Sequence, residues 1–238
     1  MYCYRLWLLP SRCWLISPCG NIELGCKGRA MLTLDNVSVK RANSLLFEPI
    51  SCVMKPGEIL TFQGESGRGK STLLHALIHE EPQVELVGQI TLDGQSMDMS
   101  VRLSECAQTV FQDPMLFSHL SVGANIALSM HRFPRSEHER RVNALLNQLG
   151  LDGIAKADPF RLSRGQMMRV AVARALAPHP RVLLLDEPFS ALDIETREHV
   201  KTVLFGQIKN DQSYGILVTH HAEDRPPEGE CICLMPSL

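Results

Sequence analysis

The sequence has no apolar run of the about 18 residues that a membrane-crossing helix needs, although 45% of its 238 residues are hydrophobic. It also lacks an excess of charge of one sign, because its formal net charge is −2. A nucleic-acid-binding surface normally carries a basic excess, so we expect no nucleic acid among the partners. Length and composition are those of one ordinary globular domain.

Paired cysteines are missing as well. The chain has eight cysteines, but none of them form a C-x-x-C pair. Four lie in the first 30 residues and the others are scattered, with Cys231 and Cys233 as the nearest pair. That pair has no second ligand pair at the spacing of a zinc site. We therefore expect structurally incidental thiols.

Residues 1–30 differ in character from the rest. Their apolar stretch is interrupted by Pro10, Arg12 and Pro18, and no small-residue cleavage site follows it. From Met31 onward, apolar and polar residues alternate as in a half-buried strand. We expect a domain over residues 31–238, preceded by an extension at 1–30 that is disordered or lies before the true start. The alternative is a membrane-surface anchor.

A phosphate-binding loop is present at residues 64–71, which read GESGRGKS. They fit the pattern G-x-x-x-x-G-K-[ST], and a short apolar run precedes them while leucines at helical spacing follow. Strand, glycine-rich loop and helix is the order that such a loop requires. The residues expected to bind the phosphates are Gly64, Glu65, Ser66, Gly67, Arg68, Gly69, Lys70, Ser71 and Thr72.

An acidic strand end supplies the second part of such a site. Residues 182–185 are continuously apolar and lead into Asp186 and Glu187. A continuous apolar run is typical of a strand covered on both faces, and parallel sheets bind ligands at the carboxyl edge. We expect Asp186, with Ser71, to hold Mg²⁺, and Glu187 to polarise an attacking water.

Further motifs occur in a fixed order along the chain. Residues 162–166 read LSRGQ, 110–114 read VFQDP, 190–193 read SALD and 218–221 read VTHH. Together with the phosphate loop, they resemble the ATP-binding subunits of ABC transporters over about residues 31–224. The LSRGQ string departs from the family's Leu-Ser-Gly-Gly-Gln at Arg164. The residue types also suit a helix start at Ser163, whose free amides face an anion.

The resemblance implies a function and a set of partners. The expected cofactors are ATP and Mg²⁺, with Glu187, His220 and Gln112 as catalytic residues and Gln112 also as a metal ligand. Ser163, Gly165 and Gln166 would bind the ATP held by a second, head-to-tail subunit. The chain would power separate membrane permease subunits at the cytoplasmic face of the inner membrane, most simply in a bacterial importer with a substrate-binding protein.

The sequence departs from the family pattern at two points. The aromatic residue that stacks on adenine in many relatives is not evident near residues 40–42, which read KRA. Arg164 adds charge near the partner's phosphates. The alternative functions are an exporter, a lipoprotein-release ATPase, a soluble ABC ATPase without a transport role, and an adaptor that senses nucleotide and scarcely hydrolyses it.

The predicted fold is α/β: a P-loop core with an antiparallel β subdomain and a helical subdomain at about 114–164. The β-rich edge is expected at residues 31–63 and 86–96. In the helical part, Ser136 and Glu139 fit a capping box ahead of apolar residues at i, i+3, i+4 and i+7 spacing. Apolar residues at 115–117, next to Gln112, indicate a partner-binding patch if exposed.

Overall fold

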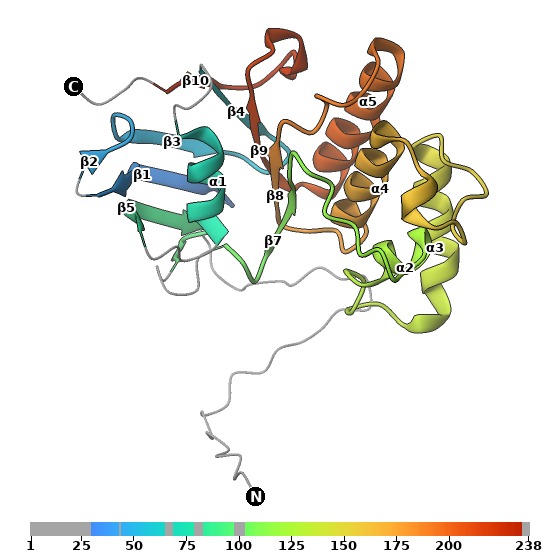
Figure 1. Ribbon diagram of the computed structural model, residues 1–238. Coiled ribbons are helices and arrows are strands. Elements are labelled where there is room, and N and C mark those ends of the chain that lie inside the picture. Colours follow the sequence, from blue (N-terminus) through green and yellow to red (C-terminus); the bar gives the residue numbers. More distant parts are fainter. Residues whose placement is uncertain (1–29, 43, 65–68, 79–82, 98–102, 235–238) are drawn as a thin grey trace, which may run out of the picture.

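The computed structural model describes residues 30–42, 44–64, 69–78, 83–97 and 103–234. Two sheets and a set of helices form successive layers, with an antiparallel sheet at one side and most helices at the other (Figure 1). The α/β P-loop fold with a β subdomain and a helical part is confirmed. Across the described residues, no helix combines the length and hydropathy needed to span a bilayer.

A parallel sheet forms the centre of the molecule. Its strand order is β10-β4-β9-β8-β7, and each neighbouring pair is parallel. Every residue of β8 and β9 is buried, as continuous apolar runs predict for strands covered on both faces. The strands are β4 (Ile59–Gln63), β7 (Ala107–Val110), β8 (Val182–Asp186), β9 (Tyr214–Thr219) and β10 (Cys231–Cys233).

The antiparallel strands form a sheet of their own. The central strand is β1, which pairs with β2, β3 and β5. The sequence-based expectation of an antiparallel edge over 31–63 is wrong at its end, because β4 pairs in parallel within the other sheet. The strands are β1 (Leu32–Arg41), β2 (Ser44–Leu45), β3 (Ile50–Met54), β5 (Val84–Leu92) and β6 (Gln95–Ser96).

Two apolar cores lie on the two faces of the parallel sheet. The first joins the antiparallel sheet, helix α1 (Lys70–Ile78) and one face of the parallel sheet. The second joins the opposite face to α4 (Arg164–Leu176) and α5 (Ile194–Asp211). Because residues of a strand alternate between faces, Leu184 lies in the first core and Leu185 in the second.

The helical part contains α2 (Val122–Ala127), α3 (Arg135–Gln148) and the short helix η1 (Pro159–Arg161), and it contributes to the second core. The expected capping box at Ser136 is wrong. Helix α3 begins one residue earlier, at Arg135, and Pro134 occupies the N-cap position without a side-chain hydrogen bond. Ser136 is therefore the second residue of the helix, inside the first turn, and does not stand at the N-cap position that a capping box requires.

The bulge between β1 and β5 generates a stability prediction. At Gly88, φ is +102° and an added Cβ would lie 2.4 Å from the Asn36 carbonyl oxygen, whereas at Gly94, φ is +79° and the Cβ position is open. We expect Gly88→Ala to lower the free energy of unfolding by roughly 3 kcal/mol or more, through strain and overpacking. The matched Gly94→Ala should cost about 1 kcal/mol. Equal losses in urea unfolding would contradict this packing.

Candidate functional site

The candidate site lies at the carboxyl edge of the parallel sheet. In register, Gln63 of β4 pairs with Thr219 of β9, and Asp186 of β8 pairs with Val218. The chain leaves these strands at neighbouring points, so the residues that follow each strand meet at one edge. This brings together the phosphate loop, the acidic pair and the histidine motif, which lie far apart in the sequence.

The phosphate loop connects β4 to α1, as the sequence predicts. Gly69 has a φ of +79°, which favours glycine, and an added Cβ would lie 3.1 Å from Leu46 Cδ1. Lys70 is buried, and its Nζ donates to the Gly64 carbonyl oxygen at 2.7 Å. Burial lowers the pKa of the Lys70 ammonium. Glu65, Ser66, Gly67 and Arg68 lie outside the described residues.

Ser71 and Asp186 form the candidate metal site. Ser71 Oγ donates to Asp186 Oδ1 at 3.0 Å, joining the start of α1 to the end of β8. Asp186 is 4% exposed, and burial raises the pKa of its carboxyl group. Two hard oxygen donors fit Mg²⁺, which usually takes one or two protein ligands and completes its shell with phosphate and water. Thr72 follows on α1 and is half-buried.

The metal would depend on the nucleotide for its other ligands. Among the residues with described positions, no group of three or more His, Cys, Asp or Glu side chains could hold a metal ion. A hydroxyl and one buried carboxylate are too few ligands for a protein-only site. The donor set therefore fits a metal bound together with phosphate.

Glu187 accepts contacts from two separate loops. Its Oε1 lies 2.8 Å from His220 Nδ1, which follows β9, and its Oε2 accepts from Gln112 Nε2, which follows β7, at 3.3 Å. The Glu187 backbone has a φ of +46°, an unusual value for a non-glycine residue, and its N–H donates to the Val218 carbonyl. The structure thus brings the three predicted catalytic residues together.

Gln112 was also predicted as a metal ligand. In this structure its amide nitrogen contacts Glu187, and the Ser71 hydroxyl is the contact made by Asp186. An amide side chain offers both a donor and an acceptor, so the contact with Glu187 leaves its oxygen available. Gln112 therefore lies beside the Glu187 carboxylate in the described geometry.

The Ser163 turn stands at the start of α4. Ser163 Oγ accepts from the Gln166 N–H at 3.2 Å, and Gln166 Oε1 accepts from the Ser163 N–H at 2.9 Å, which completes a capping box. A Cβ on Gly165 would lie 3.2 Å from the Ala191 carbonyl oxygen. Ser163 and Arg164 are exposed. Each of these two side chains thus accepts from the backbone N–H of the other residue, and the turn is exposed at Ser163 and Arg164.

Sequence reasoning missed two features of the site. Leu46 packs against Gly69, whereas the residues expected near the base were 40–42. The buried Asp224 accepts a hydrogen bond from Thr219, directly before His220. The sequence places Asp224 only four residues after His220, which could have drawn attention to it. Its burial could not be predicted in this way, because it depends on packing against α5.

The raised pKa of Asp186 predicts how a substitution alters stability. A carboxyl with a higher pKa in the folded chain binds protons more readily there, so its ionisation destabilises the fold as pH rises above about 4. Asp186→Asn keeps an oxygen acceptor for Ser71 and removes the charge. We expect its melting temperature to exceed that of the wild type at pH 7 in nucleotide-free buffer. The two should converge as pH falls below about 4, the ordinary pKa of the carboxyl, where Asp186 is protonated in both the folded and the unfolded chain.

Ser71→Ala serves as the control, since it removes the hydrogen bond and keeps the charge. It should melt below the wild type at pH 7. A melting temperature of Asp186→Asn at or below that of the wild type across this range would contradict the account.

Comparison with known proteins places the chain in a family. The ABC transporter family model matches residues 47–190. The uncharacterized ABC transporter ATP-binding protein YnjD of Escherichia coli is 35% identical over 204 residues, covering 85% of this chain and 94% of YnjD. The spermidine/putrescine import ATP-binding protein PotA of Chromobacterium violaceum is 37% identical over 208 residues, covering 86% of this chain. The Fe(3+) ions import ATP-binding protein FbpC of Streptomyces avermitilis is 40% identical over 172 residues, covering 71% of this chain.

The chain spans only 55% of the length of PotA and 49% of FbpC. Among solved structures, the ATP-binding cassette MJ0796, in a dimeric post-hydrolysis state bound to ADP and Pi, matches with a TM-score of 0.72. It is 27% identical, and the match covers 85% of this chain and 94% of that one. The order of motifs, the fold and these relatives agree: the chain belongs to the ABC transporter family, as one of its ATP-binding proteins.

Proposed function

We propose that this chain hydrolyses ATP as one of a head-to-tail pair and thereby powers a separate membrane permease, most simply that of a bacterial importer. The observation that carries the proposal is the position of Glu187, which lies between His220 and Gln112 at the end of β8. A base held by two side chains beside a phosphate loop fits in-line attack of water on a terminal phosphate.

The mechanism combines the phosphate loop of the sequence with the groups at the carboxyl edge of the sheet. The amides of residues 64–72, the Lys70 ammonium and the start of α1 would hold the phosphates. Mg²⁺, held by Ser71 and Asp186, would neutralise charge on the phosphate oxygens. Glu187 would accept the proton of the attacking water, while His220 and Gln112 keep its carboxylate aligned.

Glu187 must point toward the nucleotide rather than into the sheet. Its φ of +46° departs from the strand conformation and turns the chain at this position. Such a backbone is retained only where its surroundings hold it, here by the bond from the Glu187 N–H to Val218. The strained backbone of Glu187 therefore supports a role in which its carboxylate points away from the carboxyl edge of the sheet, toward the nucleotide.

A second copy of the chain would complete each pocket. The Ser163 turn is exposed and a helix start suits an anion, so its amides would serve a site outside their own chain. The dimeric state of the related cassette MJ0796 supports this arrangement. Arg164, in place of the family's glycine, would add a positive charge near the partner's ATP.

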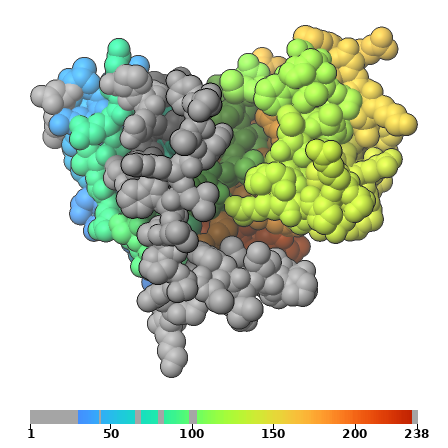
Figure 2. Space-filling view, turned by 90° about the horizontal axis from the view of Figure 1, so that it is seen from below, coloured from blue at the N-terminus to red at the C-terminus, as the bar shows by residue number. Residues whose placement is uncertain are grey.

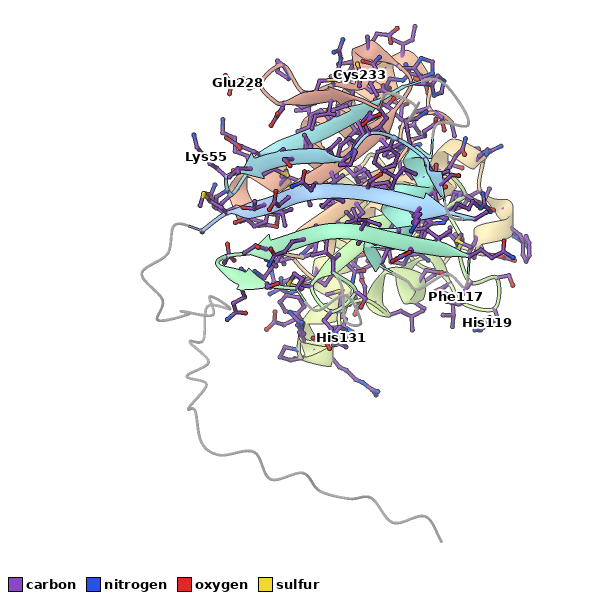
Figure 3. All side chains as sticks on the ribbon, turned by 90° about the vertical axis from the view of Figure 1, so that its left-hand side faces the viewer. Lys55, Phe117, His119, His131, Glu228 and Cys233 are labelled. Carbon is purple, nitrogen blue, oxygen red and sulfur yellow. The ribbon has the colours of Figure 1, made fainter. Side chains whose placement is uncertain are left out.

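An exposed apolar patch supports a permease as the partner. Met115 and Phe117 are 60% and 49% exposed, although each is a large apolar side chain. The lobe that carries this segment projects to one side in Figure 2, and Phe117 and His119 lie together at its margin in Figure 3. Exposed apolar patches of this kind mark binding sites.

The patch is also rigidly supported. Arg174 of α4 donates to the carbonyl oxygens of Pro114 and Met115, at 2.9 and 2.8 Å. The buried Asn125 side chain bonds both the N–H and the carbonyl of Phe117, at 2.8 and 3.0 Å. A preformed surface loses less entropy on binding, so this support favours a docking role.

Domain bounds, direction of transport and location complete the proposal. The domain would cover residues 31–238, with a helical subdomain at about 114–164. The import relatives PotA and FbpC favour import, with a substrate-binding protein as a further partner and the cytoplasmic membrane face as the location. Purification with the permease would test this. Isolation instead with ribosomes, without any membrane subunit, would support the non-transport alternative.

Replacement of Glu187 tests the base directly. Glu187→Gln keeps the size of the side chain and its contacts with Gln112 but cannot take the proton. We expect kcat for ATP to fall by about 10²–10⁴, with ATP affinity preserved. Steady-state phosphate release and equilibrium binding of ATP measure the two quantities. Turnover within about twofold of the wild type would remove Glu187 as the base.

Association of the Glu187→Gln chain with ATP tests the shared pocket. We expect it to form a dimer with Mg-ATP in size-exclusion chromatography with light scattering, and adding Ser163→Arg should abolish the dimer while each chain still binds ATP. Ser121 provides a matched control, because it also caps a helix through its hydroxyl. Ser121→Ala should leave the dimer intact, although each lost cap costs about 1 kcal/mol. Dimers that persist with Ser163→Arg would refute the head-to-tail arrangement.

A further inference from the structure

The turn that carries His220 is anchored by a buried polar cluster. Strand β9 ends at Thr219, and residues 220–224 return toward α5 through the short helix η2 (Ala222–Asp224). Thr219 and Asp224 are each 1% exposed, whereas His220 is exposed. A buried carboxylate is costly unless it is paired, so its presence next to an exposed functional side chain requires a physical reason.

One oxygen of Asp224 is bonded within the turn. Thr219 Oγ1 donates to Asp224 Oδ2 at 2.8 Å and accepts from the His221 N–H at 3.1 Å. A single hydroxyl thus ties both flanks of His220, since Thr219 precedes it and His221 follows it. The backbone of His220 is held between these two bonds.

The other oxygen faces α5. Asp224 Oδ1 lies 3.9 Å from Arg197 Nε, and both atoms are buried without a hydrogen-bond partner in the described structure. Lys201, one turn further along α5, donates from Nζ to the Glu223 carbonyl at 2.6 Å. The turn is therefore fastened to α5 at two successive residues.

The Asp224–Arg197 pair is not expected to add much to the stability of the folded chain. The Asp224–Arg197 distance is too long for a hydrogen bond, and a buried ion pair often stabilises less than apolar packing of the same volume. What the cluster does supply is a fixed position for the chain on either side of His220. His220 Nδ1 in turn lies 2.8 Å from Glu187 Oε1.

We infer that Asp224 is a positioning residue for hydrolysis, acting through Thr219 to hold His220 against Glu187. The inference rests on the proposed function, because it requires His220 to take part in turnover. Arg197 balances the carboxylate charge and joins the His220 turn to α5, which begins directly after Asp193 of the SALD segment. Asp224 contacts no nucleotide in this scheme.

The test combines Thr219→Val, which is nearly isosteric and removes the hydroxyl, with Asp224→Ala and the conservative Thr219→Ser. We expect Thr219→Val and Asp224→Ala to lower kcat for ATP by roughly 10- to 100-fold, since small misplacements of catalytic groups cost this much. KM and the affinity for ATP should stay within about twofold, because the phosphate loop is untouched. Thr219→Ser should restore kcat to within about threefold of the wild type.

A double-variant cycle separates positioning from a general structural effect. In a His220→Ala background, Thr219→Val should cause no further loss of single-turnover hydrolysis, because residues acting as one unit are not additive. Losses that multiply, or a wild-type kcat in both Thr219→Val and Asp224→Ala, would overturn the inference. Should Asp224→Ala fail to fold, Thr219→Val decides alone.

Failure of the proposed function gives a different result. His220→Ala would then hydrolyse ATP as fast as the wild type, or the wild type would show no hydrolysis with its permease. In contrast, failure of the inference alone leaves His220→Ala impaired and the Thr219 and Asp224 variants fully active.

Discussion

Parallel alignment of the central strands is the constraint on which the site depends. Strands β4, β7, β8 and β9 run in one direction, so their carboxyl ends lie along a single edge. Four chain segments, up to about 150 residues apart in sequence, thereby reach one place. The apolar cores on both faces hold this alignment. Any change that shifts the register of β8 against β9 would separate Glu187 from His220.

The site is arranged at some cost to the stability of the folded chain. Asp186 is an acid whose burial raises its pKa, and Glu187 holds a left-handed backbone conformation. Asp224 has one oxygen without a hydrogen-bond partner in the described structure. Each feature opposes folding, and each points toward the same carboxyl edge. Strain and desolvation concentrated at one edge of a well-packed sheet are typical of a site shaped by function.

Sequence reasoning recovered the parts that depend on local pattern. The continuous apolar runs predicted β8 and β9, and Ser163 within LSRGQ predicted the cap of α4, because these signals need no partner elsewhere. It failed where tertiary contacts decide. Pro134, and not Ser136, stands at the N-cap of α3, and the antiparallel strands form a separate sheet instead of an edge of the parallel one. The turn of Glu187 and the burial of Asp224 depend on β9 and α5, so no local string could reveal them.

The central claim is that a single chain carries only part of each catalytic pocket. Glu187, His220 and Lys70 meet at one edge, while the Ser163 turn is exposed and holds its own capping box. The most direct test measures ATP hydrolysis per chain over a range of chain concentrations, with light scattering at each concentration. The account predicts that the specific rate rises with concentration and levels off as dimers form. A constant specific rate down to concentrations at which every chain is monomeric would contradict it.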